Sequence, residues 1–142
     1  MVPVAQLRKR IRSAIEAGRR GAAERRQRAV AASRAYETFL NEMATPAFRQ
    51  VANVLRAEGL PFDVQTPANG VHLVSDRMRD DRIELELDTS SDPPSPMLIV
   101  TRTRGGRLLR AERPVKEGAA IEAITEDELI ERLIDELRPW LE

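Results

Sequence analysis

One feature of the sequence limits its possible folds more than any other: a stripe of apolar and small side chains that runs along the first 43 residues. The members of the stripe recur mostly at steps of three and four, which is the repeat of one face of an α-helix. Only Arg25 and Arg26 interrupt it. The pattern predicts a helix from about residue 4 to about residue 44. The stripe consists of Val4, Leu7, Ile11, Ile15, Gly18, Ala22, Ala29, Ser33, Tyr36, Leu40 and Met43.

Two glycines, Gly18 and Gly21, are the weakest part of this helix, because each costs about 1 kcal/mol relative to alanine in a helix interior. We expect one long helix. The alternative is a hinge that lets residues 4–17 fold back. An unbroken helix would be ~60 Å long, whereas a body of the remaining residues has a radius of gyration of about 13 Å. Such a body cannot cover the helix, so we expect a second copy of the chain to bury the rest of the stripe.

The second part of the chain begins where Thr45 and Pro46 resemble the N-cap and first position of another helix, which Gly59 would end. From residue 61 apolar side chains alternate with polar ones, as in strands with one buried face. The three prolines within residues 89–96 indicate a loop, since proline cannot occupy a central ladder position. The five expected strands cover residues 61–65, 71–76, 82–88, 97–104 and 107–113.

The last expected element is a helix that opens with a capping box, formed by Thr125 and Glu128. Short connections between the strands favour an antiparallel meander. The predicted fold is therefore α+β, with a long N-terminal helical region, a five-stranded antiparallel meander sheet and a C-terminal helix packed on one sheet face. We expect two domains, a helix over residues 1–44 and a compact helix–five-strand–helix domain over residues 45–142.

Charge is distributed unevenly along the chain, although 23 basic and 23 acidic residues balance overall. Residues 1–60 hold 12 basic and 5 acidic residues, and residues 61–142 hold 11 basic and 18 acidic ones. This asymmetry indicates either a basic interaction surface or attraction between the two halves. The chain has no cysteine, no apolar run near the ~20 residues of a membrane span and no secretory signal at its start. We expect a cytoplasmic protein without a membrane partner.

Chemistry-bearing side chains do not assemble into a catalytic or metal-binding motif in the sequence. His72 is the only histidine, and we expect it on the wet face of a strand without metal-binding partners. A row formed by Glu84, Glu86 and Asp88 is expected to make cross-strand ion pairs. The expected basic row opposite consists of Arg102, Arg104 and Arg110. We expect no catalytic residue, metal or cofactor; an unfamiliar enzyme would need a concave site near Glu84, Glu86 and Arg102.

Two hypotheses for function remain. The first is a non-enzymatic interaction or adaptor module that self-associates into a homodimer, or binds another protein, through Val4, Leu7, Ile11, Ile15, Ala22, Ala29, Tyr36, Leu40 and Met43. The alternative is nucleic-acid binding by the arginine-rich face of residues 8–34, through Arg8, Lys9, Arg10, Arg12, Arg19, Arg20, Arg25, Arg26 and Arg28. The absence of interleaved aromatic side chains, on which bases could stack, favours the first hypothesis.

Overall fold

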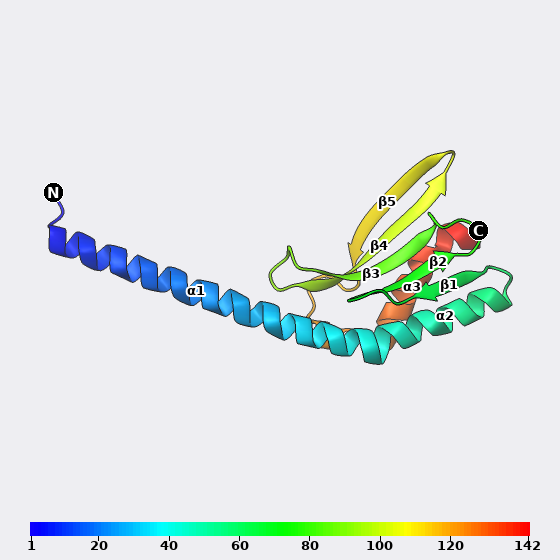
Figure 1. The fold of residues 1–142 in the computed structure, drawn as a ribbon, viewed down its shortest axis with the longest axis horizontal. Coiled ribbons are helices and arrows are strands. Elements are labelled where there is room, and N and C mark those ends of the chain that lie inside the picture. Colours follow the sequence, from blue (N-terminus) through cyan, green and yellow to red (C-terminus); the bar gives the residue numbers. More distant parts are fainter.

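The computed structural model describes residues 1–142 and consists of a long helical rod attached to a small body (Figure 1). The rod comprises α1 (Val4–Phe39), the π-helical turn η1 (Leu40–Ala44) and α2 (Thr45–Ala57). The body adds a five-stranded antiparallel sheet and the C-terminal helix α3 (Glu126–Leu141). The predicted α+β class is confirmed. No hinge forms at the two glycines, because α1 runs through them as one helix of 36 residues.

The junction of α1 and α2 differs from the prediction. Thr45 was expected to cap a new helix, but it has helical dihedral angles, and the position before α2, Ala44, makes no side-chain cap bond. Pro46 has no N–H to donate, and its ring crowds the carbonyl four residues earlier. The chain responds by widening into η1, where the Thr45 N–H donates to the carbonyl of Leu40. The rod therefore bends here and continues instead of ending (Figure 1).

The sheet has the predicted strand order β1-β2-β3-β4-β5 with every neighbouring pair antiparallel. One difference lies at the start of β4, which includes Pro96 although the expected loop extended to that residue. Proline is tolerated there because it stands beside the strand's first residue, and its carbonyl accepts the Val115 N–H at 3.1 Å. The strands are β1 (Phe62–Gln65), β2 (Val71–Ser75), β3 (Arg82–Asp88), β4 (Ser95–Arg104) and β5 (Arg107–Pro114).

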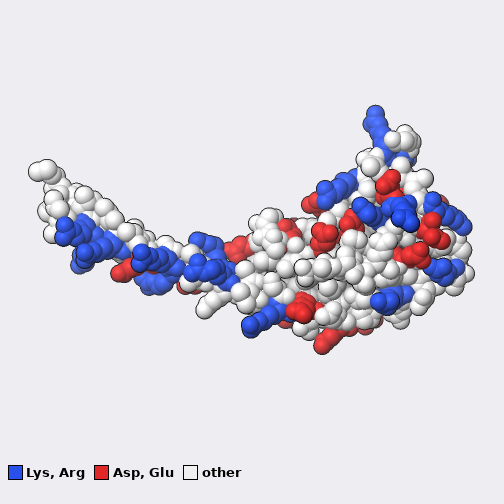
Figure 2. Space-filling view, in the orientation of Figure 1, with Lys and Arg blue, Asp and Glu red and all other residues white.

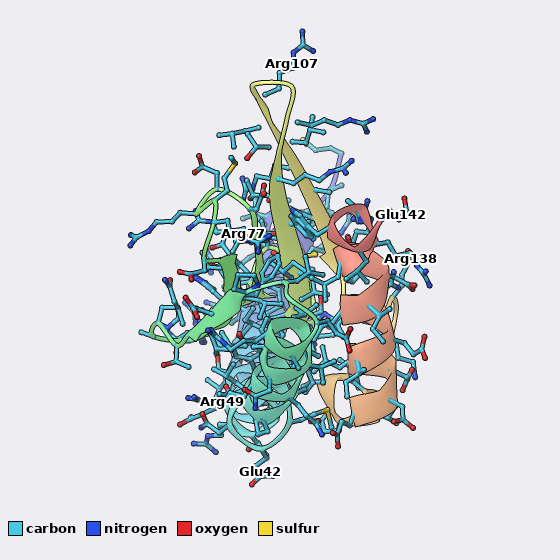
Figure 3. The ribbon with its side chains drawn as sticks, turned by 90° about the vertical axis from the view of Figure 1, so that its right-hand side faces the viewer. Glu42, Arg49, Arg77, Arg107, Arg138 and Glu142 are labelled. Carbon is cyan, nitrogen blue, oxygen red and sulfur yellow. The ribbon has the colours of Figure 1, made fainter.

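A single hydrophobic core lies between one face of the sheet and the helices α1, α2 and α3. Leu85 of β3 and Leu98 of β4 are paired in register and fully buried, and Phe48 of α2 is buried with them. The predicted capping box of Thr125 and Glu128 starts α3. Figure 3 shows α3 beside α2, and the β4–β5 hairpin extending away from both with Arg107 at its tip. The helices thus cover one sheet face and leave the other open.

The body covers α1 only over its C-terminal part. Ala32, Tyr36 and Phe39 are buried in the core, whereas no residue before Ala32 is buried. The free segment therefore ends near residue 31 rather than at the expected boundary of residue 44. We call residues 4–31 the arm. At 1.5 Å per residue it extends about 42 Å from the body, as the blue and light-blue part of the ribbon shows (Figure 1).

Candidate functional site

The arm presents an apolar face with nothing of its own chain beneath it. Leu7, Ile11 and Ile15 are 48%, 51% and 49% exposed. Because an α-helix has 3.6 residues per turn, these side chains lie on the same face as Tyr36 and Leu40, which pack into the core. The face that binds helix to sheet thus continues past the edge of the body.

The structure corrects part of the predicted self-association surface. Tyr36 and Leu40 are buried in the chain's own core, and Met43 packs against it. The sheet and helices of the same chain begin to cover the stripe at residue 32, so Tyr36 and Leu40 are not available to a partner and Met43 is available only in part. Ala22 is partly buried. The predicted residues that remain exposed are Val4, Leu7, Ile11, Ile15 and Ala29.

The arm is also strongly basic. It holds nine basic side chains against Glu16 and Glu24, a balance of +7, so the remaining residues of the chain carry a balance of −7. Figure 2 shows the positive charges as a band along the arm and most of the negative charges on the body. The side chains expected to bind nucleic acid are all exposed: Arg8, Lys9, Arg10, Arg12, Arg19, Arg20, Arg25, Arg26 and Arg28.

Arg28 differs from the other basic side chains of the arm because it binds within the chain. Its Nε and Nη2 atoms donate to the two carboxylate oxygens of Asp92, at 3.1 and 3.0 Å, in the bidentate geometry that arginine favours. This hydrogen bonding lowers the pKa of Asp92. The pair links the base of the arm to the β3–β4 loop, so a phosphate would have to compete with Asp92 for the two nitrogens that Arg28 uses there.

The predicted ion pairs across the open sheet face are wrong. Glu84 lies opposite Ile99 and Glu86 lies opposite Met97. Because β4 places Leu98 and Val100 toward the core, Arg102 has the same parity and lies on the helix side of the sheet, in a hollow that it shares with residues of α3. Arg104 has the same parity as Arg102 and lies opposite Arg107 of β5, and Arg110 forms an ion pair with Glu112 on its own strand.

His72 does have potential ligand partners, contrary to the prediction. The register of β2 and β3 places it opposite Glu84. Its Nε2 atom lies 3.4 Å from Oε2 of Glu84 and 3.9 Å from Oε1 of Glu86. The side chains of His72 and Glu84 are only 14% and 15% exposed. Arg82 places its Nε 3.2 Å from the other carboxylate oxygen of Glu84. Alternation put these residues on one face, but only the register of the β2–β3 hairpin brings them together.

A cleft of about 560 Å³ borders this cluster and is lined by both His72 and Glu86. Tyr36 and Glu37 of α1 also line it, together with Asn69 in the turn after β1. The Tyr36 hydroxyl donates to the Asn69 carbonyl at 2.8 Å. Burial raises the pKa of Tyr36, with a smaller effect from Glu86, so its hydroxyl stays protonated. This bond fixes the turn from which His72 enters β2.

The turn also needs a glycine before β2. A Cβ atom on Gly70 would lie 2.8 Å from the backbone carbonyl oxygen of Leu85. This contact is too short, and the oxygen cannot move away because it belongs to the paired backbone of β3. The cleft and the cluster therefore depend on close backbone contact between this turn and β3. A concave site does exist beside Glu86, but Arg102, which was expected there, lies on the opposite sheet face.

None of the helices has both the length and the apolar character that a membrane crossing requires. Comparison with known proteins finds no family model, no curated protein and no solved structure that matches the chain.

Proposed function

We propose that the protein is a non-enzymatic interaction module that self-associates through its arm. The observation that carries the proposal is the continuity of the helix face. The face buried at Tyr36 continues to Leu7, where the same kind of side chain is about half exposed. Exposed apolar surface of this kind, interrupted here at Arg25 and Arg26, commonly marks an interaction site. A partner that covers the arm would extend the core of the body along α1.

A second copy of the chain is the partner that the charges favour. The arm has a balance of +7 and the rest of the chain −7, so an arm attracts a body. The unbroken helix holds each arm away from its own body, and this attraction therefore acts between molecules. Two arms lying only against each other would bring like charges together. We propose a closed twofold dimer in which each arm lies along the body of the other copy.

A variant that changes Leu7, Ile11 and Ile15 to glutamine tests the proposal. Glutamine has nearly the helix propensity of leucine, so the arm keeps its helical tendency while its stripe becomes polar. Sedimentation velocity should show a dimer for the unmodified chain and a monomer for the variant. Val30→Gln is the matched control, because Val30 is also exposed on the arm but lies about 100° around the helix from Ile11, and it should leave the dimer intact. A triple variant that stays dimeric would contradict the proposal.

Nucleic-acid binding is the second candidate, and the exposure of the arm's charges supports it. Of its nine basic side chains only Arg28 forms an ion pair within the chain. Such a surface would bind phosphates with little sequence preference and a strong dependence on salt. Fluorescence anisotropy with a duplex DNA at several salt concentrations would measure it. A variant with four arginines of the arm changed to glutamine should bind more weakly, and its affinity should depend less steeply on salt concentration. The four are Arg19, Arg20, Arg25 and Arg26. Unchanged binding in that variant would exclude this candidate.

A further inference from the structure

Three side chains that can act as metal ligands converge on the open face of the sheet. His72, Glu84 and Glu86 each offer one ligand atom, and these three atoms lie within 4.8 Å of one another. They come from adjacent antiparallel strands, His72 from β2 and the two glutamates from β3. Positions fixed by a sheet ladder vary less than positions on a loop, so the backbone already holds the three groups together.

The spacing of the ligand atoms fits a first-row metal ion. Nitrogen and oxygen ligands at ~2.0–2.1 Å from a tetrahedral zinc ion lie roughly 3.3 Å apart. The His72 Nε2 atom is 3.4 Å from Glu84 Oε2 and 3.9 Å from Glu86 Oε1. The first distance already fits. The second requires a small rotation of Glu86, whose side chain is half exposed and free to turn.

The imidazole of His72 gives a second, independent observation. Its Nε2 atom is shielded from solvent and has no hydrogen-bond partner, because its approach to Glu84 is close but not aligned for a hydrogen bond. Buried polar atoms in folded proteins nearly always have a partner. Two side-chain atoms lack a partner here, His72 Nε2 and Arg82 Nε, and both lie beside the Glu84 carboxylate. A metal ion bound to Nε2 would satisfy the histidine.

We propose that His72, Glu84 and Glu86 bind one divalent transition-metal ion, with Zn²⁺ as the best fit. Imidazole nitrogen suits zinc and its neighbours, whereas Mg²⁺ and Ca²⁺ prefer oxygen ligands alone. Two carboxylates also balance the charge of a divalent ion. The Arg82 Nε atom lies 3.2 Å from the second oxygen of Glu84, in an ion pair without an aligned hydrogen bond; charged neighbours of this kind commonly tune metal ligands.

The adjoining cleft gives this metal site a route to a further ligand. His72 and Glu86 both line the cleft, so the fourth position of a tetrahedral ion would face it. A zinc ion with three protein ligands and one exchangeable position can bind an anionic or neutral donor from solution. The inference is independent of self-association, since no residue of the arm takes part.

Isothermal titration calorimetry of the full, chelator-treated chain with Zn²⁺ alone tests the site. One ion should bind per chain, and His72→Gln and Glu86→Gln should each weaken binding at least tenfold. The control is Glu112→Gln, which removes another half-exposed glutamate from the same sheet face and should leave the affinity unchanged. Because the Glu86 side chain is half exposed, weaker zinc binding by Glu86→Gln would reflect the lost ligand and not a damaged fold. Equal melting temperatures of this variant and the unmodified chain without metal would confirm this.

Cobalt provides a spectroscopic check. Co²⁺ in place of Zn²⁺ should give the visible absorption of a low-coordinate site, and His72→Gln should abolish it. The proposal is overturned if zinc does not saturate at one ion per chain. It is equally overturned if both His72→Gln and Glu86→Gln bind zinc as tightly as the unmodified chain.

Discussion

Replacing Ile11 by alanine should weaken the dimer without destabilising the monomer. Full burial of an isoleucine side chain contributes about 1.5–3 kcal/mol. Ile11 is 51% exposed in the single chain, so roughly half of that, about 1 kcal/mol, remains to be gained when a partner covers it. A twofold dimer contains two copies of Ile11. The substitution should therefore cost about 2 kcal/mol per dimer and raise the Kd about 30-fold.

Sedimentation equilibrium over a range of protein concentrations measures this change directly. Alanine favours helix more than isoleucine does, so a weaker dimer cannot be attributed to unwinding of the arm. The control is Val30→Ala, which shortens a side chain that is 53% exposed on the arm but outside the stripe, and its Kd should match that of the unmodified chain. A Kd within twofold of the unmodified value for Ile11→Ala would refute the role of the stripe.

Three further predictions concern contacts within the body. Tyr36→Phe removes the hydrogen bond to the Asn69 carbonyl and should lower the free energy of unfolding by about 1–2 kcal/mol in urea denaturation. Arg113→Met leaves the buried carboxylate of Glu136 in α3 without its ion-pair partner at 2.7 Å. The free energy of unfolding, also from urea denaturation, should fall by about 1–3 kcal/mol, less than for a fully buried pair because Arg113 is half exposed. The Lys116 ammonium and the N-cap hydrogen bonds lower the pKa of Glu128 below 4.5. Their contribution is therefore present above pH 4.5 and lost as pH falls through the lowered pKa. In thermal melts, Glu128→Gln should be less stable than the unmodified chain near neutral pH, and the two should converge in acid.

Periodicity in the sequence was enough to predict most of the fold. The stripe from Val4 to Met43 correctly predicted an unbroken helix, because helix geometry depends on neighbours three and four residues away. The alternation of Ile83, Leu85 and Leu87 likewise predicted a strand with one buried face, and the structure places that strand at the centre of the meander. Both patterns are local, so they can be read without knowing the tertiary structure.

Features that depend on distant residues were not predicted. The stripe does not change character at Ala32, so the sequence could not show where the body begins to cover it. The π-helical turn lets the helix continue past Pro46 while α2 packs against β1 and β2, whereas proline chemistry alone indicated a break. The prediction for Arg102 failed because strand pairing alone was considered. It also depended on which residues of β4 face the helices, and Arg102 is one of them.

The metal-ligand cluster was missed for the same reason. His72 and Glu84 are separated by a hairpin whose register determines whether their side chains meet. Shifting that register by one residue would move one of them to the other sheet face. The sequence pattern placed both side chains on the open face. Predicting that they meet would also have required the register of the β2–β3 hairpin.

The mass of the unmodified chain in solution tests the central claim most directly. Size-exclusion chromatography with multi-angle light scattering, recorded at low and high salt with absorbance at 260 and 280 nm, gives both the mass and any bound nucleic acid. We predict twice the chain mass of 16.0 kDa, a protein-like absorbance ratio, and a dimer that weakens as salt screens the attraction between arm and body. A monomer at every protein concentration, in low as well as high salt, would contradict self-association through the arm.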